Sequence, residues 1–100
     1  MICREDVVYL SGPMTGLPDY NRPEFIQAEL MLRLCYGCKV LNPARWQDGL
    51  SWTEYMRLDM ELLREATVLV RLPGWKGSRG AVIEDEVFSM GGLLVVDLGE

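Results

Sequence analysis

Four short apolar runs, separated by segments with helical patterns, limit most strongly what this chain can fold into. The runs cover residues 7–10, 38–41, 66–72 and 93–96. Strands that alternate with helices predict a parallel sheet whose connections are right-handed crossovers. We therefore expect an α/β fold built on a four-stranded parallel sheet.

Start and stop signals mark the helices between these runs. Asn21 is a favourable N-cap residue, and Gly37 offers the left-handed stop that often ends a helix. Ser51 and Glu54 have the spacing of a capping box at the start of a second helix. Ser78 is expected to cap a third helix, which ends near residue 90.

Size and charge narrow the classes of function. One hundred residues suit a single domain over 1–100, and so small a domain gains buried surface when it forms a homo-oligomer. The formal net charge of −5 opposes binding of polymeric nucleic acid. No apolar run approaches the ~20 residues that cross a membrane. An odd count of three cysteines suits a reducing compartment, so we expect a cytoplasmic protein.

Familiar metal and nucleophile motifs do not explain a function. Cys35 and Cys38 match C-x-x-C, but they lie where a helix runs into a strand, the reverse of a thioredoxin-like motif. Zinc would need further soft ligands, and only Cys3 remains because the chain has no histidine. The absence of histidine also excludes Ser-His-Asp and Cys-His nucleophiles. We expect neither a metal nor a cofactor.

The loops that follow the first three strands are rich in Gly, Pro, Trp and Asn. In open parallel sheets, ligands bind outside the carboxyl ends of the strands, where the strand order reverses. We therefore expect a small-molecule site at this edge. The candidate binding residues are Ser11, Gly12, Met14, Thr15 and Gly16 in the first loop, Asn42 after the second strand, and Trp75, Ser78 and Gly80 after the third.

Two of these features have more than one interpretation. The first loop is either a backbone cradle for a phosphate or sugar, or an ordinary turn, and Pro13 removes one N–H donor from it. Trp46, Trp52 and Trp75 lie near the same edge. Each either stacks on a base or fills a subunit interface.

Glu84 is the candidate catalytic group. It follows the apolar residues Val82 and Ile83, where burial would make a charge costly unless it has a partner. Two further carboxylates come directly after it, so a solvated surface position is the alternative. Since Ser78 is six residues earlier, a bent or delayed helix start would bring both side chains to the cleft. Asp59 is likewise either a surface charge or a functional group.

These residues together resemble the nucleoside 2-deoxyribosyltransferase-like family, in particular a small branch common in phage and prophage genomes. The similar segments, in the family's order, are residues 9–16, Asn42 with Pro43, Asp59 ahead of the third strand, and residues 72–84. The resemblance implies a flavodoxin-like (Rossmann-like) three-layer sandwich. It also implies cleavage or exchange of the N-glycosidic bond of a deoxynucleoside or deoxynucleoside monophosphate.

The resemblance assigns roles to individual residues. Glu84 corresponds to the nucleophile, Asp59 to a residue that orients sugar or base, and Tyr9 to a residue near the sugar. Ser78 occupies a position that is serine in the monophosphate N-hydrolases and aspartate in several transferases. A non-catalytic nucleotide-binding or regulatory protein is the alternative, and a small oligomer with tryptophans at its interface is a third.

Overall fold

Four parallel strands form one sheet in the order β2-β1-β3-β4 in the computed structural model, which describes residues 2–45 and 49–98. The strands are β1 (Val7–Ser11), β2 (Lys39–Leu41), β3 (Val68–Arg71) and β4 (Leu94–Asp97). Every neighbouring pair runs parallel. The predicted four-stranded parallel sheet is therefore confirmed.

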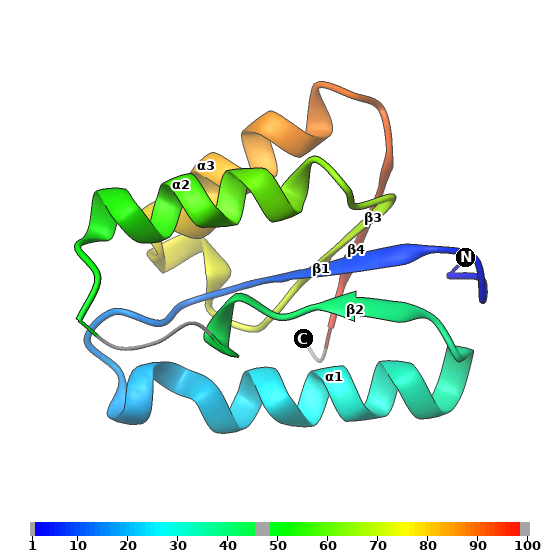
Figure 1. The fold of residues 1–100 in the computed structure, drawn as a ribbon, viewed down its shortest axis with the longest axis horizontal. Coiled ribbons are helices and arrows are strands. Elements are labelled where there is room, and N and C mark those ends of the chain that lie inside the picture. The colour runs from blue at the N-terminus through cyan, green and yellow to red at the C-terminus, as the bar shows by residue number, and fades with distance from the viewer. Residues whose placement is uncertain (1, 46–48, 99–100) are drawn as a thin grey trace.

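Helices cover both faces of this sheet. Helix α1 (Arg22–Tyr36) lies on one face, whereas α2 (Trp52–Leu63) and α3 (Arg79–Ser89) lie on the other (Figure 1). The molecule therefore has three layers with the sheet in the middle. This arrangement and the strand order confirm the flavodoxin-like three-layer fold.

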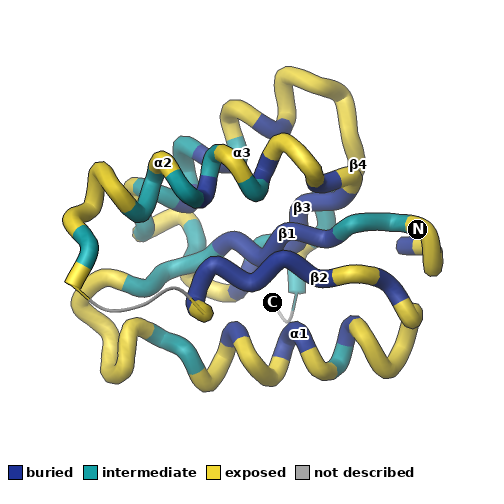
Figure 2. The backbone as a smooth tube through the Cα atoms, in the orientation of Figure 1, coloured by how far each residue is buried: buried dark blue, intermediate teal, exposed yellow. Residues whose placement is uncertain are grey.

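The core consists of two apolar clusters, one on each face of the sheet. Figure 2 shows the buried strands between helices whose outer sides are exposed. Successive strand residues point to opposite faces, so Val8 and Leu10 pack with Phe25 of α1. Tyr9 and Leu69 instead pack with Phe88 of α3. Because β1 is central, both of its faces are buried, and the alternation decides which layer each side chain meets.

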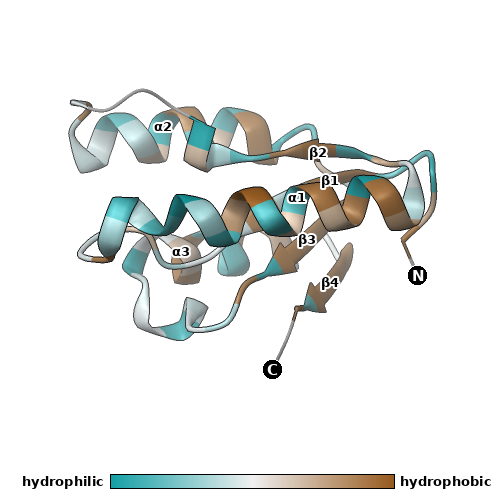
Figure 3. Cartoon of the chain, turned by 90° about the horizontal axis from the view of Figure 1, so that it is seen from below, coloured by the Kyte–Doolittle hydropathy of each residue, from teal (hydrophilic) through white to brown (hydrophobic). Residues whose placement is uncertain are grey.

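Apolar residues concentrate on the strands, whereas the helices carry both polar and apolar positions (Figure 3). This is the pattern of helices that pack one face on a sheet and leave the other exposed. None of the helices among the described residues is long and apolar enough to cross a membrane.

The strand order reverses between the neighbouring strands β1 and β3, because β2 lies on one side of β1 whereas β3 and β4 lie on the other. The loop after β1 and the loop after β3 therefore leave the sheet side by side. The amide of Leu72 donates to the carbonyl of Ser11 at 2.7 Å. A Cβ on Gly12 would lie 2.8 Å from the Cβ of Leu72, so only glycine allows this approach.

Most of the predicted helix signals are confirmed. The side chain of Ser51 accepts from the amide of Glu54, and the side chain of Glu54 accepts from the amide of Ser51, which completes the capping box. Ser78 caps α3 by accepting from the amide of Ala81, and Gly37 ends α1 in the left-handed conformation.

The predicted capping role of Asn21 is wrong. Asn21 precedes α1, but its φ of 61° is left-handed and its side chain makes no capping hydrogen bond. Asp19 and Tyr20 are also left-handed, so the last three residues of the short Pro18–Asn21 turn all have positive φ. The Asn21 side chain donates instead to the carbonyl of Pro13 at 2.9 Å and joins this turn to the first loop.

Candidate active site

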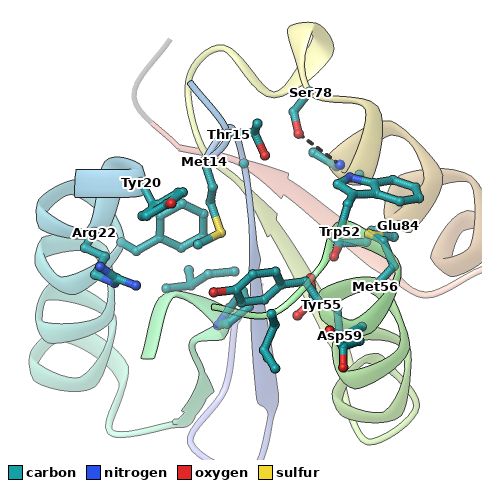
Figure 4. A pocket seen from close by; sticks show the side chains of 18 of the residues that line it. Met14, Thr15, Tyr20, Arg22, Trp52, Tyr55, Met56, Asp59, Ser78 and Glu84 are labelled. Atoms are coloured by element: carbon teal, nitrogen blue, oxygen red, sulfur yellow. Dashed lines mark hydrogen bonds between the residues drawn. The ribbon is translucent and has the colours of Figure 1, made fainter. Parts of the chain in front are cut away.

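A cavity of about 530 Å³ opens at the carboxyl edge of the sheet (Figure 4). This size falls within the range of small-molecule sites. Its wall combines the first loop, the start of α1, the N-terminal half of α2 and the start of α3. Of the predicted site residues, the lining includes Gly12, Met14, Thr15, Asp59, Ser78, Gly80 and Glu84.

Glu84 lies in this lining with only 4% of its surface exposed. The hydroxyl of Tyr9 donates to its Oε2 at 2.7 Å, and the hydroxyl of Ser11 donates to its Oε1 at 2.6 Å. Tyr9 and Ser11 are two residues apart on β1, so their side chains share the face that α3 covers. The surface alternative for Glu84 is therefore excluded, because the carboxyl group is buried and both of its oxygens are engaged.

Asp59 brings a second carboxyl group to the same place from α2, where it is also buried. Burial, and then the charge of Asp59, raise the pKa of Glu84 to about 8. The pKa of the Tyr9 hydroxyl is raised well above its ordinary value, by burial first and then by the charges of Glu84 and Asp59. Near neutral pH the carboxyl group of Glu84 is therefore largely protonated in the free protein.

Helix α3 brings Ser78 and Glu84 to the cavity without the bend that their six-residue separation suggested. Ser78 is the N-cap itself, so α3 begins directly at Arg79. The cavity reaches from the end of the helix along its first turns, and both side chains line it. Gly80 lies between them, where a Cβ would come within 3.1 Å of Sδ of Met56.

Tyr55 and Met56 of α2 were missed by the sequence interpretation, whereas Asp59 was predicted as a site residue and Trp52 as a residue near this edge. Trp52, Tyr55, Met56 and Asp59 all line the cavity from α2. Their spacing of i, i+3, i+4 and i+7 places them on one helix face, and this was the signal that could have found them. Tyr55 faces the cavity and is half-buried.

The opposite wall comes from the turn before α1 and from the start of α1. It consists of Tyr20, Arg22 and Phe25. The guanidinium of Arg22 lies 5.2 Å from the centre of the Tyr20 ring and donates to Asp19 and to the carbonyl of Ala44. Figure 4 shows Tyr20 and Arg22 across the cavity from the labelled side chains of α2.

One known protein family matches most of the chain. A family model described as "Domain of unknown function (DUF4406)" matches residues 6–97. The chain belongs to this family. No curated protein and no solved structure matches the chain. The matched span of the DUF4406 domain contains all four strands, together with Tyr9, Asp59 and Glu84.

Other candidate residues of this DUF4406 domain are not among those that line the cavity. Asn42 donates to Glu29 at 3.0 Å and accepts from the amide of Ala44, so both ends of its amide contact the protein. The ring of Trp75 lies 4.3 Å from the guanidinium carbon of Arg71. Gly16 has a left-handed φ of 84° in the first loop. Trp46 lies outside the described residues.

Metal ligands do not gather in this site. Within residues 2–45 and 49–98, no group of three or more His, Cys, Asp or Glu side chains could hold a metal ion. Cys35 and Cys38, which match C-x-x-C in the sequence, are free thiols. The groups that the site brings together are the carboxyl groups of Glu84 and Asp59 and the hydroxyls that donate to Glu84.

Proposed function

We propose that this protein cleaves or exchanges the N-glycosidic bond of a 2′-deoxynucleoside or its monophosphate, with Glu84 as the nucleophile. One observation supports this above all. Both oxygens of the buried Glu84 carboxyl accept hydroxyl hydrogen bonds at the wall of a cavity of suitable size, beside the second carboxyl of Asp59. The resemblance to the nucleoside 2-deoxyribosyltransferase-like family assigns the same three side chains, Tyr9, Asp59 and Glu84.

In the first step, an oxygen of ionised Glu84 attacks the anomeric carbon of the deoxyribose. The bond from that carbon to the base nitrogen breaks, and its electron pair leaves with the base. Glu84 is ionised for this attack because it first passes its proton to Asp59, and the leaving base then takes that proton from Asp59. Hydroxyl donors on both Glu84 oxygens favour this placement, because they stabilise the ionised form of Glu84 and not its protonated form.

In the second step, water or another base attacks the anomeric carbon of the glycosyl-enzyme. The bond to Glu84 breaks and releases Glu84 as an ionised carboxylate. Asp59 accepts the proton that the water or the incoming base loses. Water gives hydrolysis and a second base gives transfer, so one arrangement of residues serves both outcomes.

The same proposal covers partners and location. The ligand is a small nucleoside or nucleotide, and we propose a homo-oligomer in the cytoplasm. Large apolar side chains remain exposed on the outer surface, including Leu30 and Leu34 of α1 and Met90 after α3. Sedimentation at several protein concentrations tests the oligomer, and a single monomeric species at all of them would contradict it.

Base release from a panel of deoxynucleosides and their monophosphates tests the activity. We expect free base with the wild-type protein and loss of release with Glu84→Ala. Equal behaviour of the two proteins across the panel would contradict the proposal. Thermal stabilisation by a nucleotide without any turnover would favour the non-catalytic binding protein instead.

A further inference from the structure

The N-terminal half of α2 has an aromatic face that the proposed chemistry does not use. Trp52, Tyr55 and Met56 line the cavity, while the apolar contacts of α2 with the core come from later residues such as Met60 and Leu63. Trp52 remains 39% exposed. The first turn of this helix and the start of the second therefore present apolar and aromatic surface to the cavity, where a ligand can bury it.

Distance along the helix separates this face from the carboxyl groups. At a rise of 1.5 Å per residue, Asp59 lies about 6 Å along the axis from Tyr55 and about 10 Å from Trp52. A deoxyribose placed at Asp59 and Glu84 would therefore project its base toward the aromatic end of the cavity. Figure 4 shows Trp52, Tyr55 and Asp59 on the same side of it.

Trp52 is also held in place from a neighbouring helix. The guanidinium carbon of Arg79, the first residue of α3, lies 4.4 Å from the centre of the Trp52 ring. Such a contact stabilises an aromatic ring even at an exposed site. A Cβ on Gly80 would lie 3.9 Å from Nε1 of Trp52, so the start of α3 packs closely against the ring.

We infer that Trp52 and Tyr55 form the surface that binds the planar base of the substrate, and that Arg79 is a positioning residue for Trp52. This inference rests on the proposed function for the identity of the ligand. The base is then bound by residues of α2 that line the cavity, and not by Trp75, which does not line it. Stacking tolerates any base because every base has an aromatic face.

The chain contains its own matched control. Trp75 is stacked on Arg71 at 4.3 Å, as Trp52 is on Arg79 at 4.4 Å, but Trp75 is not among the residues that line the cavity. The chain has three tryptophans, so the variant Trp46→Phe/Trp75→Phe leaves Trp52 as the only tryptophan. The variant Trp46→Phe/Trp52→Phe leaves Trp75.

The experiment titrates 2′-deoxyadenosine into both single-tryptophan proteins, each carrying Glu84→Gln so that the ligand is not consumed. We expect saturable quenching of Trp52 and no saturable change of Trp75. In a protein that keeps all other tryptophans, Trp52→Leu should raise Kd by about tenfold or more, whereas Trp75→Leu should not change it. Trp52→Phe should restore most of the affinity.

Two results would overturn the inference: quenching of Trp75 without Trp52, or no saturable response of either one. Since the titration requires no bond cleavage, a protein that binds through Trp52 but releases no base would contradict only the proposed function. Conversely, base release that depends on Glu84 but is unaffected by Trp52→Leu in both KM and kcat would contradict only the inference. If Trp52→Leu does not fold, the titration of the intact Trp52 ring still decides.

Discussion

The hydroxyl of Tyr9 donates to Oε2 of Glu84 across 2.7 Å, and so joins a central strand to a helix that lies 75 residues later in the chain. Both side chains are buried, and Ser11 donates to the other carboxyl oxygen. Two neutral donors thus replace water around a carboxyl group whose burial would otherwise disfavour its charge. The charge state of Glu84 therefore depends on these two donors and on Asp59.

Tyr9→Phe should reduce activity near neutral pH by about tenfold or more, because a hydrogen bond to a charged group is lost. The same donor lowers the pKa of Glu84, so its removal should move the acid limb of the pH–rate profile to higher pH. The profile of kcat/KM against pH measures this shift. Tyr36→Phe, at an exposed position on α1, is the control. An unchanged profile in Tyr9→Phe would exclude this role.

Glu84→Gln should change how stability depends on pH. The pKa of Glu84 is about 8 in the folded protein and near the ordinary 4.5 when unfolded, so the folded state binds more protons between these values. Stability contributed by this group is therefore complete below about pH 4.5 and falls by up to about 1.4 kcal/mol per pH unit until about pH 8.

Urea denaturation at several pH values measures this dependence. The Glu84→Gln protein should lack it, whereas Glu86→Gln, at an exposed position on the same helix, should retain it. If the wild-type and Glu84→Gln proteins have parallel stability curves between pH 5 and pH 8, then Glu84 is not held in its protonated form.

Gly80→Ala should separate binding from stability. The added Cβ would lie 3.1 Å from Sδ of Met56 and would push that side chain toward the cavity, so KM should rise. Alanine also favours a helix by up to about 1 kcal/mol over glycine, so the free energy of unfolding should not fall in proportion. Gly77→Ala meets no atom within 4 Å and should leave KM unchanged. Equal KM values for the two variants would show that Met56 does not border the ligand.

Asn42→Ala should act on stability rather than on binding. Asn42 donates to Glu29, whose carboxylate is buried and also accepts from Arg33 and Arg45. Burial alone would raise the pKa of Glu29, but these hydrogen bonds outweigh it and lower the pKa. Loss of one donor should cost about 1–3 kcal/mol in urea denaturation. A wild-type unfolding curve with weakened nucleoside binding would instead place Asn42 in the site.

The fold could be predicted from the sequence because its main signals depend on residues that are close together in the chain. The apolar runs, the Ser51 and Glu54 capping box and the stop at Gly37 each depend on neighbours within a few residues, and all three are confirmed. The prediction that Asn21 caps a helix is wrong because three consecutive residues, Asn21 included, are left-handed, whereas a capping residue requires an extended backbone. The Asn21 side chain instead donates to the carbonyl of Pro13.

The site was less predictable because it depends on contacts between distant segments. Nothing near Asp59 in the sequence indicates that it is buried beside Glu84, since α2 and α3 come together only in the folded chain. The face of Trp52, Tyr55 and Met56 has helical spacing, but spacing alone does not distinguish a core from a cavity. Whether such a helix face meets the core or a cavity is decided only by how the three layers are arranged.

Identification of the residue to which the sugar becomes covalently attached tests the central claim most directly. Wild-type protein is mixed with a deoxynucleoside, quenched in acid within the first turnovers, digested and analysed by mass spectrometry. We predict a 2-deoxyribosyl group attached to the peptide that contains Glu84, and its absence in Glu84→Gln. Base release by the wild-type protein at full rate with no adduct on Glu84, and equal release by Glu84→Gln, would contradict the account.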